Sequence, residues 1–167
     1  MKKNGSVKKL AAAALLTAAA LIVYMIEAQL PPLTPIPGIK LGLSNVFSMM
    51  ALMMLGPGWA FAVMAVRVML GSVLTGQVSA IIFSLAGGVP SIAACMLLKK
   101  CFRQDTVWAL SCISAIIHNS GQMVAVIFVT GTREILFYYP LLIISGIVTG
   151  AFTGLCAQLV IRRMKKN

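Results

Sequence analysis

The sequence predicts an all-α integral membrane protein with six transmembrane helices and both termini in the cytoplasm. The first observation is composition: of 167 residues, 60% are hydrophobic and 10% are charged, and the mean hydropathy is +0.98. An ordinary soluble domain is far less apolar. The second observation is that the apolar residues form six long runs, and the third is that basic residues gather at alternate ends of these runs.

The six runs predict a single domain over residues 1–167. A membrane span needs about 20 apolar residues, with a lower limit near 17. The expected spans are 10–30, 39–55, 59–74, 78–98, 107–129 and 135–161. Because the second and third are short, we expect them to be tilted or partly re-entrant, joined by the tight turn Gly56-Pro57-Gly58.

The first run could also be a secretory signal peptide, because basic residues precede an alanine- and leucine-rich core. The stretch Ile26-Glu27-Ala28 lacks the small residue that should stand three places before a cleavage site. We therefore expect this run to be retained as a span.

The distribution of Lys and Arg predicts the orientation. A net charge of +11 could indicate nucleic-acid binding, but eleven of the fourteen basic residues would lie on the inner side if the amino terminus is inside. The outer side would receive only Lys40 and Arg133, and Arg67 lies within a span. By the positive-inside rule, this bias indicates membrane orientation, with both termini cytoplasmic.

A proline-rich turn follows the first span. Four of the seven prolines lie in residues 31–37, followed by Gly38. Proline fixes φ and glycine permits unusual dihedrals, so the turn should be stiff. We expect it to face outward and to close over a binding site, with Pro37, Gly38, Lys40 and Asn45 available to a ligand.

Arg67 lies midway along the third span, where an arginine costs about 2.5–3.5 kcal/mol on insertion scales. It should therefore be paired or face water. Two roles remain open: a salt bridge to Glu27, or a ligand for an anion. Lys40 is a second candidate cation, although it could instead snorkel to the interface. Arg133 at the outer rim is a possible third.

The fifth span has a polar face. His118 and Gln122 are one turn apart on it, Asn119 is beside it, and Ser111 and Ser114 continue it toward the cytoplasm. Hydrogen bonds between helices are one explanation; a cavity wall is the favoured one.

Ser84, Gly87 and Gly88 lie in the fourth span, followed by Pro90. We expect these residues to loosen or kink that helix and to expose its backbone to a neighbour or a ligand.

The sequence offers little for catalysis. Its three carboxylates, Glu27, Asp105 and Glu134, are far apart, and there is no phosphate-binding loop for ATP. One histidine and four cysteines without a CxxC pair predict no metal site. We expect neither an enzyme nor a cofactor, and any energy must come from an ion gradient or another protein.

Three motifs in the same order resemble those of a known family. They are Pro37-Gly38-Ile39-Lys40-Leu41-Gly42-Leu43-Ser44-Asn45, Phe83-Ser84-Leu85-Ala86-Gly87-Gly88 and Ala115-Ile116-Ile117-His118-Asn119-Ser120-Gly121-Gln122. The chain is similar to bacterial membrane proteins labelled "heptaprenyl diphosphate synthase component I", also called the Gx transporter family. These resemble the substrate-binding S components of energy-coupling factor (ECF) transporters.

The resemblance implies a location in the bacterial cytoplasmic membrane and a division of labour. An S component captures a vitamin-like solute, and a transmembrane coupling protein with two ATPase subunits supplies the driving force. Its alanine-rich first span docks on the coupling protein, which implies that role for Ala14 and Ala18. The outer turn and the fourth to sixth spans frame the ligand. The candidate binding residues are Pro37, Gly38, Lys40, Asn45, Arg67, Ser84, Gly87, Gly88, His118, Asn119 and Gln122.

The expected function is therefore solute binding for ATP-driven uptake. The solute would be small, anionic, and related to vitamins, isoprenoids or quinones. Prenyl diphosphate synthases bind magnesium-diphosphate through aspartate-rich motifs, which this chain lacks. The family label thus leaves one alternative, a non-catalytic accessory subunit of heptaprenyl diphosphate synthesis. An ion-coupled secondary carrier is a further alternative.

Overall fold

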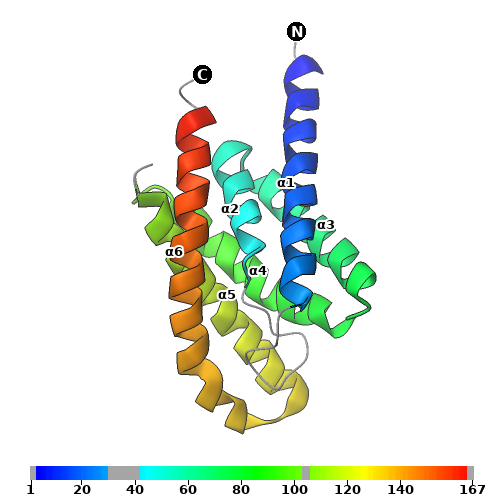
Figure 1. Ribbon diagram of the computed structural model, residues 1–167, viewed down its shortest axis with the longest axis vertical. Helices are drawn as coiled ribbons and strands as arrows, with labels where there is room; N and C mark the ends of the chain where they lie inside the picture. The colour runs from blue at the N-terminus through cyan, green and yellow to red at the C-terminus, as the bar shows by residue number, and fades with distance from the viewer. Residues whose placement is uncertain (1–2, 30–41, 103–105, 165–167) are drawn as a thin grey trace.

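The computed structural model describes residues 3–29, 42–102 and 106–164, and its described secondary structure is entirely helical. The described residues contain six α-helices and the 3-10 helix η2 (Figure 1). They are α1 (Lys3–Gln29), α2 (Asn45–Met54), α3 (Pro57–Thr75), α4 (Ser79–Leu98), α5 (Val107–Thr130), η2 (Arg133–Tyr138) and α6 (Tyr139–Met164).

Five of these helices are long and apolar enough to cross a membrane, as expected for a multi-pass membrane protein: α1, α3, α4, α5 and α6. Helix α2 has only 10 residues, or about 15 Å at 1.5 Å per residue, half the thickness of a hydrocarbon core of about 30 Å. The prediction of six spans is therefore not confirmed. Of the expected span 39–55, residues 39–41 lie outside the described part of the chain.

Helix α3 is longer than expected. It begins at Pro57, whose missing N–H costs nothing in the first turn, and it has 19 residues. It ends at Gly76, which adopts the left-handed conformation that commonly closes helices. This segment can therefore cross the membrane without the re-entrant geometry suggested by its short apolar run.

The short helix α2 stands between the two long helices α1 and α6 (Figure 1). Helix α1 packs on α2 and α3, whereas α5 packs on α4 and α6. Both ends of the chain lie at the same end of the molecule, and the connection from α5 to α6 lies at the opposite end (Figure 1). Which end faces the cytoplasm remains a prediction.

Glycines on one face of α6 bring this helix against α5. Gly146, Gly150 and Gly154 are spaced one turn apart on α6. A Cβ atom at Gly150 would lie 2.8 Å from the Cα of Cys112, and one at Gly154 would lie 2.7 Å from the Cα of Trp108. Glycine at these positions allows α6 to pack closely on α5, because a side chain there would collide with that helix.

Two apolar clusters form the core. The larger one draws on all six α-helices, with residues such as Leu52, Val63 and Ile92. The smaller one gathers residues nearer the α5–α6 connection, including Phe83 and Met123. The helices α4 and α5 contribute to both clusters. Between the residues that they supply to the two clusters, α4 and α5 carry polar side chains.

The contact between α4 and α5 gives a test of this packing. A Cβ atom at Gly121 would collide with the carbonyl oxygen of Ala86, whereas one at Gly58 would meet nothing within 4 Å. We expect Gly121→Ala to destabilise the fold by about 1–3 kcal/mol, the usual cost of overpacking. Gly58→Ala should leave the fold unchanged or slightly more stable. Thermal unfolding in detergent measures both, and equal midpoints for the two variants would contradict this packing.

Candidate functional site

Polar side chains are buried together between the two apolar clusters. On α4 they lie between Phe83 and Ile92, and on α5 between Leu110 and Met123. We call this group the buried polar layer: Glu27, Ser44, Asn45, Ser48, Arg67, Ser84, Ser91, Ser111, Ser114, His118, Asn119 and Gln122. Each member is at most 5% exposed. Burying a polar group without a hydrogen bond costs free energy, so the partners of these groups decide their role.

Arg67 is the buried cation of this layer. Its Nη1 donates a hydrogen bond to the Ser44 hydroxyl at 2.8 Å, and its guanidinium lies over the Tyr24 ring, 5.8 Å from the centroid. A Cβ atom at Gly71, one turn after Arg67, would lie 2.7 Å from that ring. Glycine at this position therefore allows the aromatic ring to pack against α3 and to cover one face of the guanidinium.

Glu27 contributes to the environment of Arg67 through charge. Its carboxylate attracts Arg67 electrostatically, while its Oε1 accepts a hydrogen bond from the Gly42 N–H at 2.6 Å. Glu27 therefore connects the end of α1 to the segment that enters α2. Of the two roles expected for Arg67, the attraction to Glu27 is present, and it does not exclude an anion at the remaining donors.

Asn45, Ser91 and Ser114 join three helices. The Asn45 Nδ2 donates to the Ser91 hydroxyl at 2.8 Å and lies 3.4 Å from that of Ser114. The two serine hydroxyls are 2.7 Å apart and share a further hydrogen bond. This cluster fixes the first turn of α2 against α4 and α5.

His118 is enclosed by two glycines. A Cβ atom at Gly42 would lie 2.8 Å from His118 Cδ2, and one at Gly87 would lie 2.8 Å from its Nδ1. Across the next turn of α5, Gln122 Nε2 lies 3.1 Å from His118 Nε2. The structure thus brings together the expected site residues Gly87, His118 and Gln122, and it explains both glycines by the room that the imidazole needs.

Asn119 faces a different neighbour. Its Nδ2 donates to the carbonyl oxygen of Leu142 at 2.8 Å, and a Cβ atom at Gly146 would lie 2.9 Å from that nitrogen. Adjacent residues on a helix point about 100° apart. Asn119 therefore pairs with α6, while His118 faces α4 and the segment before α2.

Gly88 and Ser84 differ in their surroundings. A Cβ atom at Gly88 would lie 2.6 Å from the Met64 sulfur, so Gly88 serves the packing of α3 against α4. Ser84 is buried within the polar layer. Helix α4 continues without interruption through both glycines and through Pro90, which differs from the loosened helix expected from these residues.

Several expected site residues lie elsewhere. Pro37, Gly38 and Lys40 fall outside the described residues. Ala14 and Ala18, the expected docking residues, are exposed on the outer face of α1. They remain available to another helix.

Not every polar atom of the layer has a partner. Among the described residues, Arg67 Nε and Nη2, Asn45 Oδ1, Asn119 Oδ1 and Gln122 Oε1 are buried without a hydrogen bond. The first two are donors and the other three are acceptors. Such groups each cost about 1–3 kcal/mol when left unpaired. The layer therefore has unused capacity for hydrogen bonds of both kinds.

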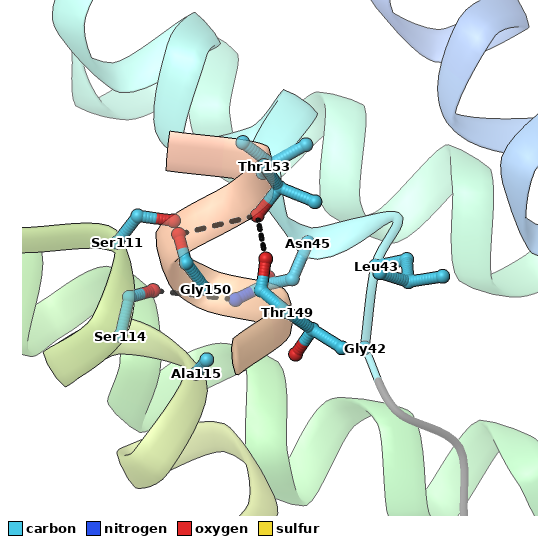
Figure 2. Close-up of a pocket in the computed structure, with 10 residues that line it drawn as sticks. Gly42, Leu43, Asn45, Ser111, Ser114, Ala115, Thr149, Gly150 and Thr153 are labelled. Carbon is cyan, nitrogen blue, oxygen red and sulfur yellow. Dashed lines mark hydrogen bonds between the residues drawn. The ribbon is translucent and has the colours of Figure 1, made fainter. Parts of the chain in front are cut away.

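The polar layer borders a small cavity between α2, α5 and α6 (Figure 2). Asn45, Ser111, Ser114 and Thr153 are among its lining residues. Its volume, measured as the space open to the centre of a water molecule, is about 10 Å³. This is close to the least that holds one water. Part of the α5 polar face is thus a cavity wall, as expected, but this cavity is too small for an organic solute.

Two larger hollows lie on the outside of the helices and are almost entirely apolar. One, of about 330 Å³, is bordered by α1, α2 and α6, with Val23, Phe47 and Phe152 in its walls. The other, of about 500 Å³, lies between α4 and α5 beside Pro90 and Val124. Neither is lined by Arg67 or His118.

A family model described as heptaprenyl diphosphate synthase component I matches residues 16–160. The chain belongs to this family. No match was found among curated proteins or among solved structures. The similarity to ECF S components remains a prediction from the sequence.

The match to the heptaprenyl diphosphate synthase component I family begins within α1 and ends within α6. It therefore includes every residue of the buried polar layer.

Sequence reasoning did not select Ser44 and Ser91, which belong to the buried polar layer, or Tyr24, which packs beside it. Tyr24, Ser44 and Ser91 contact the expected site residues Arg67 and Asn45. Tyr24 precedes Glu27 by three positions and so lies on the same face of α1, a spacing that could have indicated it. No local pattern distinguishes Ser44 or Ser91 from other serines in apolar runs.

The hydrogen bond between Asn45 and Ser91 can be tested by a double-mutant cycle. We expect Asn45→Ala and Ser91→Ala to be coupled by about 0.5–3 kcal/mol in unfolding free energy, as contacting residues are. Thr75 bonds to Gly71 within its own helix, so Asn45→Ala combined with Thr75→Ala should be additive. Additivity in both pairs would show that the observed contact is not formed.

Proposed function

We propose that this chain is the solute-binding membrane component of an ATP-driven uptake transporter. Its solute is small and anionic, and another protein hydrolyses the ATP. The chain itself acts without catalysis and without a cofactor. The buried polar layer is the binding site, and the described arrangement is its closed form.

The observation that carries this proposal is the set of buried polar atoms without partners. Burying donors and acceptors inside a membrane protein is costly, and such residues are typical of substrate pathways. Arg67 offers two donors, whereas Asn119 and Gln122 each offer an acceptor. A solute carrying one anionic group and some N–H or O–H groups would pair with all of them. Apolar residues in the same positions would have packed the helices at lower cost.

The residues have distinct roles in this proposal. Arg67 donates hydrogen bonds to the anionic group, and its Ser44 and Tyr24 contacts hold the guanidinium in place. His118 and Gln122 orient the rest of the solute. Because the cavity at the layer holds about one water, a solute can enter only when the helices separate. The contact of Gly42 with His118 is the proposed point of opening.

The partner would be a transmembrane coupling protein with two ATPase subunits. The resemblance to S components suggests this, and the exposed Ala14 and Ala18 on α1 support it. Small residues one turn apart allow another helix to approach closely. We propose that the amino and carboxyl termini lie on the cytoplasmic side, where the ATPases work.

A second candidate function follows from the family's description. As a component of heptaprenyl diphosphate synthesis, the chain would be a membrane-bound accessory subunit of a soluble synthase. This predicts co-purification with such a synthase and no solute uptake.

Transport by vesicles separates these functions. We expect vesicles containing this chain alone to bind a solute without concentrating it. Vesicles that also contain a coupling protein, its ATPases and ATP should accumulate it. The measurement is mass spectrometry of vesicles exposed to a total metabolite extract of the source cells. Accumulation by the isolated chain would instead indicate a gradient-driven carrier. No accumulation in either kind of vesicle would favour the accessory subunit.

Variants on α5 test the site. His118→Ala should weaken solute retention about 5- to 150-fold, because a buried polar partner contributes about 1–3 kcal/mol. Ser120→Ala is the matched control, since Ser120 bonds to Tyr139 instead of the polar layer. Native mass spectrometry of the gently purified proteins measures the retained solute. Equal retention of the solute by both variants would indicate that the α5 polar face serves helix packing and not solute binding.

A further inference from the structure

The unpartnered nitrogens of Arg67 form one particular edge of the guanidinium. Nη1 is occupied by Ser44, and the Tyr24 ring covers a face. The Nε and Nη2 atoms without partners lie side by side on the edge that points away from Nη1. Their N–H bonds are parallel, and this pair matches the two oxygens of a carboxylate in a bidentate contact.

We propose that the solute is a monocarboxylate and that its carboxylate binds side-on to Nε and Nη2 of Arg67. This inference rests on the proposed function and specifies its ligand. The carboxylate supplies two oxygen acceptors to the two donors that have none, and it leaves the hydrogen bond to Ser44 intact.

The charge balance of the layer disfavours more highly charged ligands. Among the described residues, Arg67 and Glu27 are the buried charged side chains. Their formal charges cancel, so any anion adds its whole charge to a buried site. An uncompensated charge is strongly unfavourable in a buried site. A monocarboxylate adds one negative charge, whereas a diphosphate adds two or more. The site thus favours a carboxylate over the diphosphate group suggested by the family's description.

The planar shape of the guanidinium allows a test that distinguishes bidentate carboxylate binding from a simple requirement for positive charge at position 67. A lysine at position 67 would keep the charge but could not present two parallel donors in a fixed plane. Loss of binding in Arg67→Lys would therefore report the geometry of the edge. Thr75→Ala serves as the matched control, because it removes a hydrogen bond to Gly71 within α3, the helix that carries Arg67, and lies outside the buried polar layer.

The test uses acetate, inorganic phosphate and pyrophosphate as probes on the purified full-length protein, at equal ionic strength. We expect acetate to raise the unfolding temperature of the wild-type protein in a saturable way. Phosphate and pyrophosphate should have smaller effects. The apparent affinity for acetate should fall at least tenfold in Arg67→Lys and should be kept in Thr75→Ala.

A second measurement does not depend on the stability of any variant. A solute retained by the wild-type protein should gain one methyl ester on chemical esterification and should contain no phosphorus. A retained phosphate or diphosphate compound would overturn the carboxylate inference while leaving the solute-capture proposal in place. A stronger effect of phosphate or pyrophosphate than of acetate would also overturn it, as would an equal acetate response in Arg67→Lys. No response to any probe together with no retained solute would contradict both proposals.

Discussion

The arrangement of the helices depends on the burial of one guanidinium. Arg67 is 2% exposed, in the middle of a span, and a cation at that depth needs compensation. It comes from three directions: the Ser44 hydroxyl before α2, and the Tyr24 ring and the Glu27 charge on α1. These contacts join α1, the entry to α2 and α3. The guanidinium thereby organises the amino-terminal half of the bundle.

The same contacts explain how a helix as short as α2 can lie inside the bundle. Non-helical backbone at membrane depth is tolerated only where protein satisfies its polar groups. The Gly42 N–H donates a hydrogen bond to the Glu27 carboxylate. Asn45, in the first turn of α2, donates to two serines on α4 and α5. The apolar residues that follow in α2 then pack into the larger core cluster. The polar layer is therefore both the support of α2 and the proposed binding site, so that a ligand at the layer acts directly on the position of α2.

Much of this fold could be predicted from the sequence, because length and hydropathy determine where helices can lie in a membrane. Three of the expected spans correspond closely to α3, α4 and α5, whereas α1 begins seven residues earlier than expected and α6 four residues later. The span expected at 39–55 is not confirmed, because apolar composition alone does not show that Asn45 and Ser48 face inward or that the described helix α2 is short. Within the site, the spacing of His118 and Gln122 predicted their shared face. It could not predict that Asn119 pairs with Leu142 on α6, since that contact depends on which helices become neighbours.

The central claim is that the unpaired donors and acceptors of the buried polar layer form hydrogen bonds with a bound solute. An experimental density map of the gently purified protein, at a resolution that shows individual side chains, tests it most directly. The account predicts non-protein density within hydrogen-bonding distance of Nε and Nη2 of Arg67. A map in which protein groups alone occupy those two donors would contradict it.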